Sequence, residues 1–376
     1  GQQPLYNLSV SFDSRGADSR AGALVSATRT VGFRYVALVT GNDTDAAFVA
    51  GAKTREGSDT HGMYFRVNGA VVFAVGANVI PMEELEGRLS ARAHVAMVQA
   101  AADARFTMLR VWGGGMFLPD AFYDACDALG LLVYHDMQYA QQGHAPKPTP
   151  TQTAELTHAV RRLASHPSIA VWDGCNECRV VMNTPTGVYA TFVMTVVARE
   201  DASRAVWPSC PALGWTAGVR MLDALPNGNT LTTPPKGDSH ETHGPYQHGT
   251  GFPAVNGASD LQAFSPLIPT NVPTKGDGAN PQQPTGPQFS NVFASEFGAV
   301  VTSSFESMAP TLAARHWGLH AGQPSDSCTD GFAHTCTGDN VMAERNYPCD
   351  SMIDAYFGAQ PDAYFNTTGE AVFKRQ

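Results

Sequence analysis

The chain has 376 residues, of which 43% are hydrophobic, so it can bury a full core and is not globally disordered. It carries 24 basic and 34 acidic residues, and the resulting charge of −10 offers no basic face for a nucleic-acid partner. No apolar run approaches the roughly 20 residues that a membrane helix needs.

The first part of the chain, residues 1–63, alternates apolar and polar residues and lacks a convincing helical period. Residues 4–13 and 30–40, and then 63–69 at the end of this part, predict strands joined by polar turns. Such alternation is typical of a β-sandwich, in which each sheet has one buried face. The stretch is short for a whole sandwich, so we expect part of that domain to lie before residue 1.

From about residue 70 onward, strands alternate with helices. The predicted strands are 71–80, 106–112, 131–137, 168–177, 205–211, 236–244 and 291–299. The predicted helices are 89–104 with Ser90 as N-cap, 118–130 with Gly130 at its end, 151–165 and 188–201. The strands are almost continuously apolar, which predicts a parallel sheet buried on both faces. The fold class is therefore α/β, either a doubly wound sheet or a (β/α)₈ barrel.

Polar side chains at the strand ends favour the barrel, because there all the carboxyl ends meet at one mouth. No Gly-x-Gly-x-x-Gly or Walker loop follows a strand, and the glycine-rich stretch 112–116 lacks the Lys-Ser/Thr partner of a phosphate loop. Residues 231–288, rich in Pro, Gly, Asn and Thr, predict a long loop insertion over the mouth. The strand-end residues are Asn78, Arg110, Trp112, Asp136, Asn176, Glu177, His240, His243 and Glu296.

Two of these residues, Glu177 and Glu296, are carboxylates at the ends of apolar strands. Cleavage of a glycosidic bond needs one carboxylic acid that protonates the leaving oxygen and one carboxylate on the opposite side of the sugar. A single glutamate would be read as an ordinary loop residue. Two in equivalent positions favour a glycosidase.

The segment "WDGCNE" (172–177) is similar to the Trp-x-Gly-Asn-Asn-Glu motif of glycoside hydrolase family 2, most of all to its β-mannosidases. Segments 67–81, 107–137, 161–177 and 293–299 resemble that family in order, over most of residues 61–300. Residues 4–10 and 29–39 look like the end of the immunoglobulin-like domain that precedes the family's barrel. The resemblance implies an immunoglobulin-like sandwich part over 1–63 and a (β/α)₈ barrel over 64–376, with no obvious last strand and a Cys-containing tail.

The resemblance also implies roles for the strand-end residues. Glu177 would be the general acid/base and Glu296 the nucleophile, with Arg110 beneath it keeping it charged. Asn176 would bind the sugar 2-hydroxyl, and Trp112 would form an apolar wall.

Three further residues would line the sugar site. Asp136 would bind sugar hydroxyls, and Asn78 would lie at the rim. His240 lies in a region similar to the family's Asp-x-His strand end. Simpler readings stay open. Arg110 would then be a core ion-pair residue, Trp112 a packing residue, Asp136 a cap and His240 a surface histidine.

Seven cysteines and three N-glycosylation sequons, at Asn7, Asn42 and Asn366, favour a secretory route that ends in the lysosome or outside the cell. Cys328, Cys336 and Cys349 suit at least one disulfide, and the odd total leaves one thiol over or pairs it with another chain. Cys175 and Cys178 flank Glu177 without the partners of a zinc or redox site. Cys175 stands where the family has Asn, so both are expected to be small apolar fillers.

The sequence thus predicts a retaining exo-β-glycosidase, a β-mannosidase that removes terminal β-D-mannose from oligosaccharides or glycoproteins by double displacement. We expect no metal and no organic cofactor. The expected partners are a β-mannoside or related oligosaccharide and the remaining N-terminal sugar-binding and C-terminal parts of the same protein. The alternative is a non-catalytic carbohydrate-binding or structural glycoprotein on a glycosidase-like barrel, because Cys175 and residues 238–249 depart from the family pattern.

Overall fold

The computed structural model describes residues 3–13, 24–40, 63–83, 85–140, 146–177, 189–207, 209–210, 241–247, 264–265, 286–287, 293–299, 303–318 and 368–375. Contacts divide the chain into two compact units. The first comprises Gly1–Thr242 with Ser290–Glu296, and the second His243–Phe289 with Phe297–Gln376.

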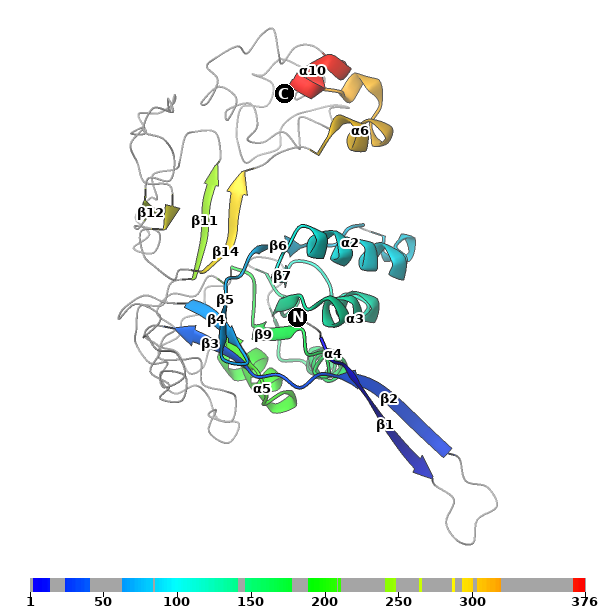
Figure 1. Ribbon diagram of the computed structural model, residues 1–376, viewed down its shortest axis with the longest axis vertical. Helices are drawn as coiled ribbons and strands as arrows, with labels where there is room; N and C mark the ends of the chain where they lie inside the picture. Colours follow the sequence, from blue (N-terminus) through cyan, green and yellow to red (C-terminus); the bar gives the residue numbers. More distant parts are fainter. Residues whose placement is uncertain are drawn as a thin grey trace. The chain divides into compact units, whose positions relative to one another are not determined.

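A five-stranded parallel sheet forms the centre of the first unit (Figure 1). Its strands are β6 (Gly76–Val79), β7 (Met108–Val111), β8 (Leu132–Asp136), β9 (Ile169–Asp173) and β10 (Ala205–Trp207). They lie side by side in the order in which they follow one another in the sequence. The α/β class and the parallel strands are therefore confirmed.

Helices connect these strands, and local signals set where the helices begin and end. They are α2 (Ala91–Asp103), α3 (Asp120–Leu129), α4 (Pro150–Leu163) and α5 (Thr195–Glu200), the last preceded by a π-helical turn, Tyr189–Met194. As predicted, the Ser90 hydroxyl caps α2 by accepting a hydrogen bond from the amide of Ala93. Gly130 ends α3 in the left-handed conformation, with φ 76°. Helices α2 and α3 pack against each other (Figure 1).

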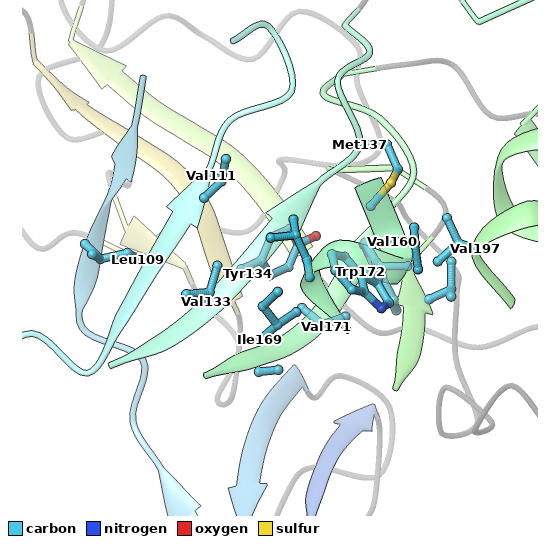
Figure 2. Close-up of a cluster of buried hydrophobic side chains, with 14 of the residues drawn as sticks. Leu109, Val111, Val133, Tyr134, Met137, Val160, Ile169, Val171, Trp172 and Val197 are labelled. Carbon is cyan, nitrogen blue, oxygen red and sulfur yellow. The ribbon is translucent and has the colours of Figure 1, made fainter. Parts of the chain in front are cut away.

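The hydrophobic core fills the space between the sheet and the helices. Figure 2 shows side chains of β7, β8, β9, α4 and α5 that join in it, among them Trp172, Val160 and Val197. The largest fully buried side chains include Trp172, Trp207, Tyr123 and Tyr134. Because side chains alternate along a strand, Trp172 and Asp173 point to opposite faces of β9. Trp172 donates from Nε1 to Asp201 at the end of α5, which leaves Asp173 on the other face.

The amino-terminal segment forms two antiparallel sheets. Strands β1 (Tyr6–Asp13) and β2 (Leu24–Val31) pair as one sheet, and β3 (Val36–Thr40), β4 (Met63–Val67) and β5 (Ala70–Val72) form the other. The predicted strand 30–40 is interrupted between β2 and β3. At this break Arg34 donates to the carbonyls of Pro167 (2.7 Å) and Ile169 (2.5 Å).

The predicted strand 71–80 is also interrupted, between β5 and β6. The Thr107 hydroxyl donates to the carbonyl of Phe73 (2.7 Å) and accepts from the amide of Val75 (2.9 Å). These hydrogen bonds hold residues 73–75 to Thr107, which lies just before β7. Residues 73–75 are therefore not part of a strand.

The remaining described elements are short. Strands β11 (Glu241–Gln247) and β14 (Phe293–Ala299) pair with each other, as do β12 (Phe264–Ser265) and β13 (Gly286–Pro287) in the second unit. The helices are η1 (Glu86–Arg88), α6 (Phe305–Met308), η5 (Ala309–Thr311), η6 (Ala314–His316) and α10 (Glu370–Arg375). Most of the predicted insertion 231–288 and the Cys-containing tail lie outside the described residues. No helix in the described ranges is long and apolar enough to cross a bilayer.

Asp201 fixes the end of α5 to the sheet. Its carboxylate accepts from Arg204 (2.5 Å), from Trp172 (2.8 Å) and from the amide of Ser203 (2.8 Å). Arg204 also donates to three backbone carbonyls, so both partners of this ion pair are buried and satisfied. Burial acts to raise the pKa of Asp201, but Arg204 and the hydrogen bonds outweigh it and lower the pKa below its usual value.

We predict that Asp201→Ala lowers the free energy of unfolding by about 3–5 kcal/mol, because it leaves the buried Arg204 charge unpaired. The contribution of Asp201 is present above its unfolded pKa of about 3.9 and is lost as the pH falls through the lower folded value. Urea unfolding at pH 7 and at pH 3 measures both effects. The exposed Asp103→Ala is the matched control, expected within about 0.5 kcal/mol of the wild type. Equal losses for the two variants would contradict this role of Asp201.

Candidate active site

Arg110 is the centre of the candidate site. It lies near the carboxyl end of β7 with 3% of its surface exposed. Its Nε and Nη2 donate to the two carboxylate oxygens of Asp136, at 3.1 and 2.6 Å, and its Nη1 donates to Oε1 of Glu296, at 2.7 Å. Nη2 also donates to Oδ1 of Asn176 at 2.8 Å. One guanidinium group thus contacts three residues that the sequence singled out.

Arg110 stays protonated despite its burial. Burial acts to lower the pKa of Arg110, but the negative charge of Asp136 outweighs it and raises the pKa well above its usual value. Arg110 is therefore a permanent cation here. Asp136 itself has no exposed surface, and its Oδ2 also accepts from the amide of Gly113 at 2.9 Å.

Asn176 and Glu177 follow β9 in a short extension of the sheet. Asn176 forms parallel bridges with Ala140 and Cys210, and its amide donates to the carbonyl of Tyr139. Glu177 donates its amide to the carbonyl of Cys210 at 2.6 Å and has a φ of 51°. A glutamate rarely adopts this left-handed conformation, which costs on the order of 1–3 kcal/mol and persists where surrounding contacts impose it. The backbone turns away from the strand at the predicted acid/base residue.

Trp112 and the glycines after it form the loop that follows β7. Trp112 is half-buried, and its ring lies against Gly114, where an added Cβ would come within 2.0 Å of a ring carbon. At Gly113 an added Cβ would lie 2.4 Å from the carbonyl oxygen of Tyr139 and 2.8 Å from that of Met137. Glycine is needed here because the loop passes directly against the ends of neighbouring strands.

A second polar layer was not foreseen from the sequence. Sγ of Cys210 lies 2.7 Å from Nη2 of Arg110 and 3.1 Å from Oδ2 of Asp173, and all three side chains are buried. Glu241, at the start of β11, accepts from the hydroxyl of Tyr134 at 2.9 Å and from Nε1 of Trp207. Asp173 ends β9 and Cys210 lies just beyond the end of β10, and that position is the signal that would have found them. Glu241, as the first residue of β11, lacks that signal.

Asp173 is a buried carboxyl group with a raised pKa. Burial raises the pKa of Asp173 well above its usual value, and the charges of Asp136 and Glu241 raise it further. Its Oδ2 accepts from the amide of Cys175 at 3.2 Å, while its buried Oδ1 has no hydrogen-bond partner in the described part of the chain.

Two groups of side chains among the described residues have the spacing of metal ligands. In the first, Asp136, Asp173 and Cys210 surround Arg110, whose positive charge opposes a cation. In the second, Asp124, Asp127 and His166, the His166 ring already contacts Asp127 at 2.7 Å, and the other oxygen of Asp127 accepts from the amide of Ser168. Neither arrangement favours an ion.

The other predicted residues are less informative. Asn78 is half-buried on β6, beside Arg110 in the parallel register. His240 lies outside the described residues, as do the sequons at Asn42 and Asn366. Asn7 is exposed on β1. Cys175 is fully buried and disulfide-bonded, so the expectation of a small apolar filler is wrong for Cys175. Cys178 lies outside the described residues.

We predict that Asp173→Asn makes the protein more stable than the wild type at neutral pH, because the raised pKa of Asp173 makes its ionised form unfavourable in the folded protein and asparagine cannot ionise. The raised pKa of Asp173 does not affect the free energy of unfolding below the unfolded pKa of about 3.9. As the pH rises from there towards the folded pKa, Asp173 destabilises the folded protein increasingly. Unfolding free energies of both proteins from pH 3.5 to 8 measure this, with Asp103→Asn as the exposed control. A stability gap that stays constant with pH would contradict the prediction.

Comparison with known proteins shows similarity to β-mannosidases. A β-mannosidase of Rattus norvegicus is 31% identical over 240 residues, which cover 59% of this chain and 25% of that protein. A β-mannosidase B of Thermothelomyces thermophilus is 31% identical over 179 residues, covering 47% and 19%. The solved β-D-mannosidase of Dictyoglomus thermophilum is 25% identical, with a TM-score of 0.43, and the match covers 65% of this chain and 27% of that one.

No protein-family model matches the chain. The chain spans about a quarter of the length of the curated relatives that it matches. Over the matching residues the chain is β-mannosidase-like, which confirms the resemblance seen in its sequence.

Proposed function

We propose that this chain carries the catalytic site of a glycoside hydrolase that removes terminal β-D-mannose by a retaining double displacement. The observation that supports this most strongly is the contact of Arg110 with Glu296 on β14 and with Asn176, the residue before Glu177. Glu177 and Glu296 were selected from the sequence as a pair. The buried Arg110 contacts Glu296 directly and contacts Asn176, which precedes Glu177 in the chain. The relatives named β-mannosidase support the choice of sugar.

We also propose that the parallel sheet is part of a (β/α)₈ barrel over residues 64–376, preceded by part of an immunoglobulin-like sandwich over 1–63. A doubly wound sheet reverses its strand order at a switch point, whereas β6 to β10 keep their sequence order. Tyr134 of β8 contacts both Glu241 of β11 and Phe293 of β14, the latter with ring centroids 5.6 Å apart. Contacts of one strand with several non-neighbouring strands are typical of a barrel interior.

In the proposed reaction Glu296 attacks the anomeric carbon of the mannoside while Glu177 donates its proton to the leaving oxygen. The glycosidic bond breaks, and an ester between the sugar and Glu296 remains. Glu177, now ionised, takes a proton from a water molecule, whose oxygen attacks the same carbon and releases Glu296. Arg110 favours the ionised form of Glu296 before the attack, since a neighbouring positive charge stabilises a carboxylate.

The other predicted residues have proposed roles around the sugar. Asn176 would hydrogen-bond the 2-hydroxyl and Trp112 would cover the ring as an apolar wall. Asn78 would lie at the rim of the site, and His240 would contribute from the segment before β11.

The wider setting follows the relatives and the sequons. We propose that the chain acts as part of a larger polypeptide with sugar-binding and carboxyl-terminal domains, because the relatives are about four times as long as the matched part. We also propose a secretory route to the lysosome or the exterior, supported by the exposed sequon at Asn7.

We predict that Glu177→Gln and Glu296→Gln each lower kcat on an aryl β-mannoside by at least about 10²-fold, because each removes a group that transfers a proton or forms a bond. The exposed Glu155→Gln on α4 is the matched control and should keep wild-type rates. Proton NMR of the first product formed by the wild type should show β-mannose. First-formed α-mannose would contradict retention, and binding of mannosides without turnover would support the carbohydrate-binding alternative.

A further inference from the structure

Asp136 was expected to bind sugar hydroxyls, but its surroundings favour a different task. Its carboxylate has no exposed surface, and both of its oxygens accept hydrogen bonds from Arg110. Oδ2 additionally accepts from the amide of Gly113, in the loop that packs against the strand ends. Both oxygens of Asp136 thus already accept hydrogen bonds from the protein, and the carboxylate is closed off from solvent.

The geometry of the Arg110–Asp136 pair sets the direction of the third guanidinium nitrogen. A guanidinium group is planar, and its Nε and Nη2 edge matches the two oxygens of a carboxylate. With that edge bound by Asp136, the remaining Nη1 points to Oε1 of Glu296. Nη2 also donates to Oδ1 of Asn176 and to Sγ of Cys210, but both acceptors are neutral and neither accepts from Nε.

We propose that Asp136 is a positioning residue, which acts through Arg110 on Glu296 and does not bind the sugar. This inference rests on the proposed role of Glu296 as nucleophile. It assigns to β8 the task of orienting a cation on β7, so that a carboxylate on β14 is held where it can attack.

The test is a double-mutant cycle on the intact protein, with an aryl β-mannoside as substrate. Asp136→Asn should lower kcat by about 10²-fold, because a small misplacement of a reacting group has an effect of that size, while KM changes less than about 3-fold. Arg110→Gln should cause a similar loss. Because Asp136 acts through Arg110, the variant with both substitutions should be no more than about 2-fold slower than Arg110→Gln alone.

Two outcomes would overturn the inference. A rise of KM for Asp136→Asn with kcat nearly unchanged would make Asp136 a sugar-binding residue. Losses that multiply in the double variant would show that Asp136 acts independently of Arg110. A wild-type protein without activity on any aryl glycoside would instead overturn the proposed function, so the two failures are distinguishable.

The same variants also control for effects of the substitutions on folding. Asp136→Asn leaves the buried Arg110 with only one of its two carboxylate partners, Glu296, and is expected to lower Tm. The double substitution removes both charges of the Arg110–Asp136 pair and should recover part of that loss. If Asp136→Asn does not fold, kcat of the double variant against Arg110→Gln still decides the question. The matched control is Asp127→Asn, a buried carboxylate on α3 that pairs with His166. It should lower Tm and leave kcat and KM unchanged.

Discussion

The candidate site depends on one buried cation. A guanidinium group taken out of water is costly unless its donors and its charge are both matched. Arg110 meets that cost with a bidentate pair to Asp136, a second ion pair to Glu296 and a hydrogen bond to Asn176. Each of these partners comes from a different strand or strand end. These contacts therefore join β7, β8, the extension of β9 and β14 around one guanidinium group.

The layer around Arg110 is polar and fully buried at Asp173, Cys210 and Glu241. Glu241 accepts hydrogen bonds from Tyr134 and Trp207, while Cys210 accepts from Arg110 and donates to Asp173. Burial also raises the pKa of the Cys210 thiol well above its usual value, so it stays a neutral thiol. The charged partners of Arg110 are Asp136 and Glu296. The left-handed backbone at Glu177 is held by contacts of the same region, to Cys210 and through Asn176 to Tyr139.

Features that depend on neighbouring residues in the sequence were predictable. The cap at Ser90, the helix end at Gly130 and the apolar runs of β7, β8 and β9 follow from local chemistry, and the structure confirms them. The interruptions of the strands at 30–40 and 71–80 were not predictable, because contacts with Pro167, Ile169 and Thr107 from distant parts of the chain cause them. One local signal was overlooked. Asn68-Gly69, with φ of 50° and 86°, forms the tight turn between β4 and β5 that an Asn-Gly pair favours.

The candidate site likewise combines features that the sequence predicts with features that depend on distant contacts. Strand-end position was enough to select Arg110, Asp136, Asn176 and Glu296, which the structure brings into contact. The engagement of both Asp136 oxygens and the raised pKa of Asp173 depend on burial and on charges from several strands, which no single segment of sequence reveals.

A crystal structure of the intact protein tests the central claim most directly, through the distance between the carboxyl groups of Glu177 and Glu296. A retaining pair is predicted to lie about 5–5.5 Å apart, with Glu296 still bound to Arg110. A separation above about 6.5 Å, or two carboxyl groups that open into different cavities, would contradict the account.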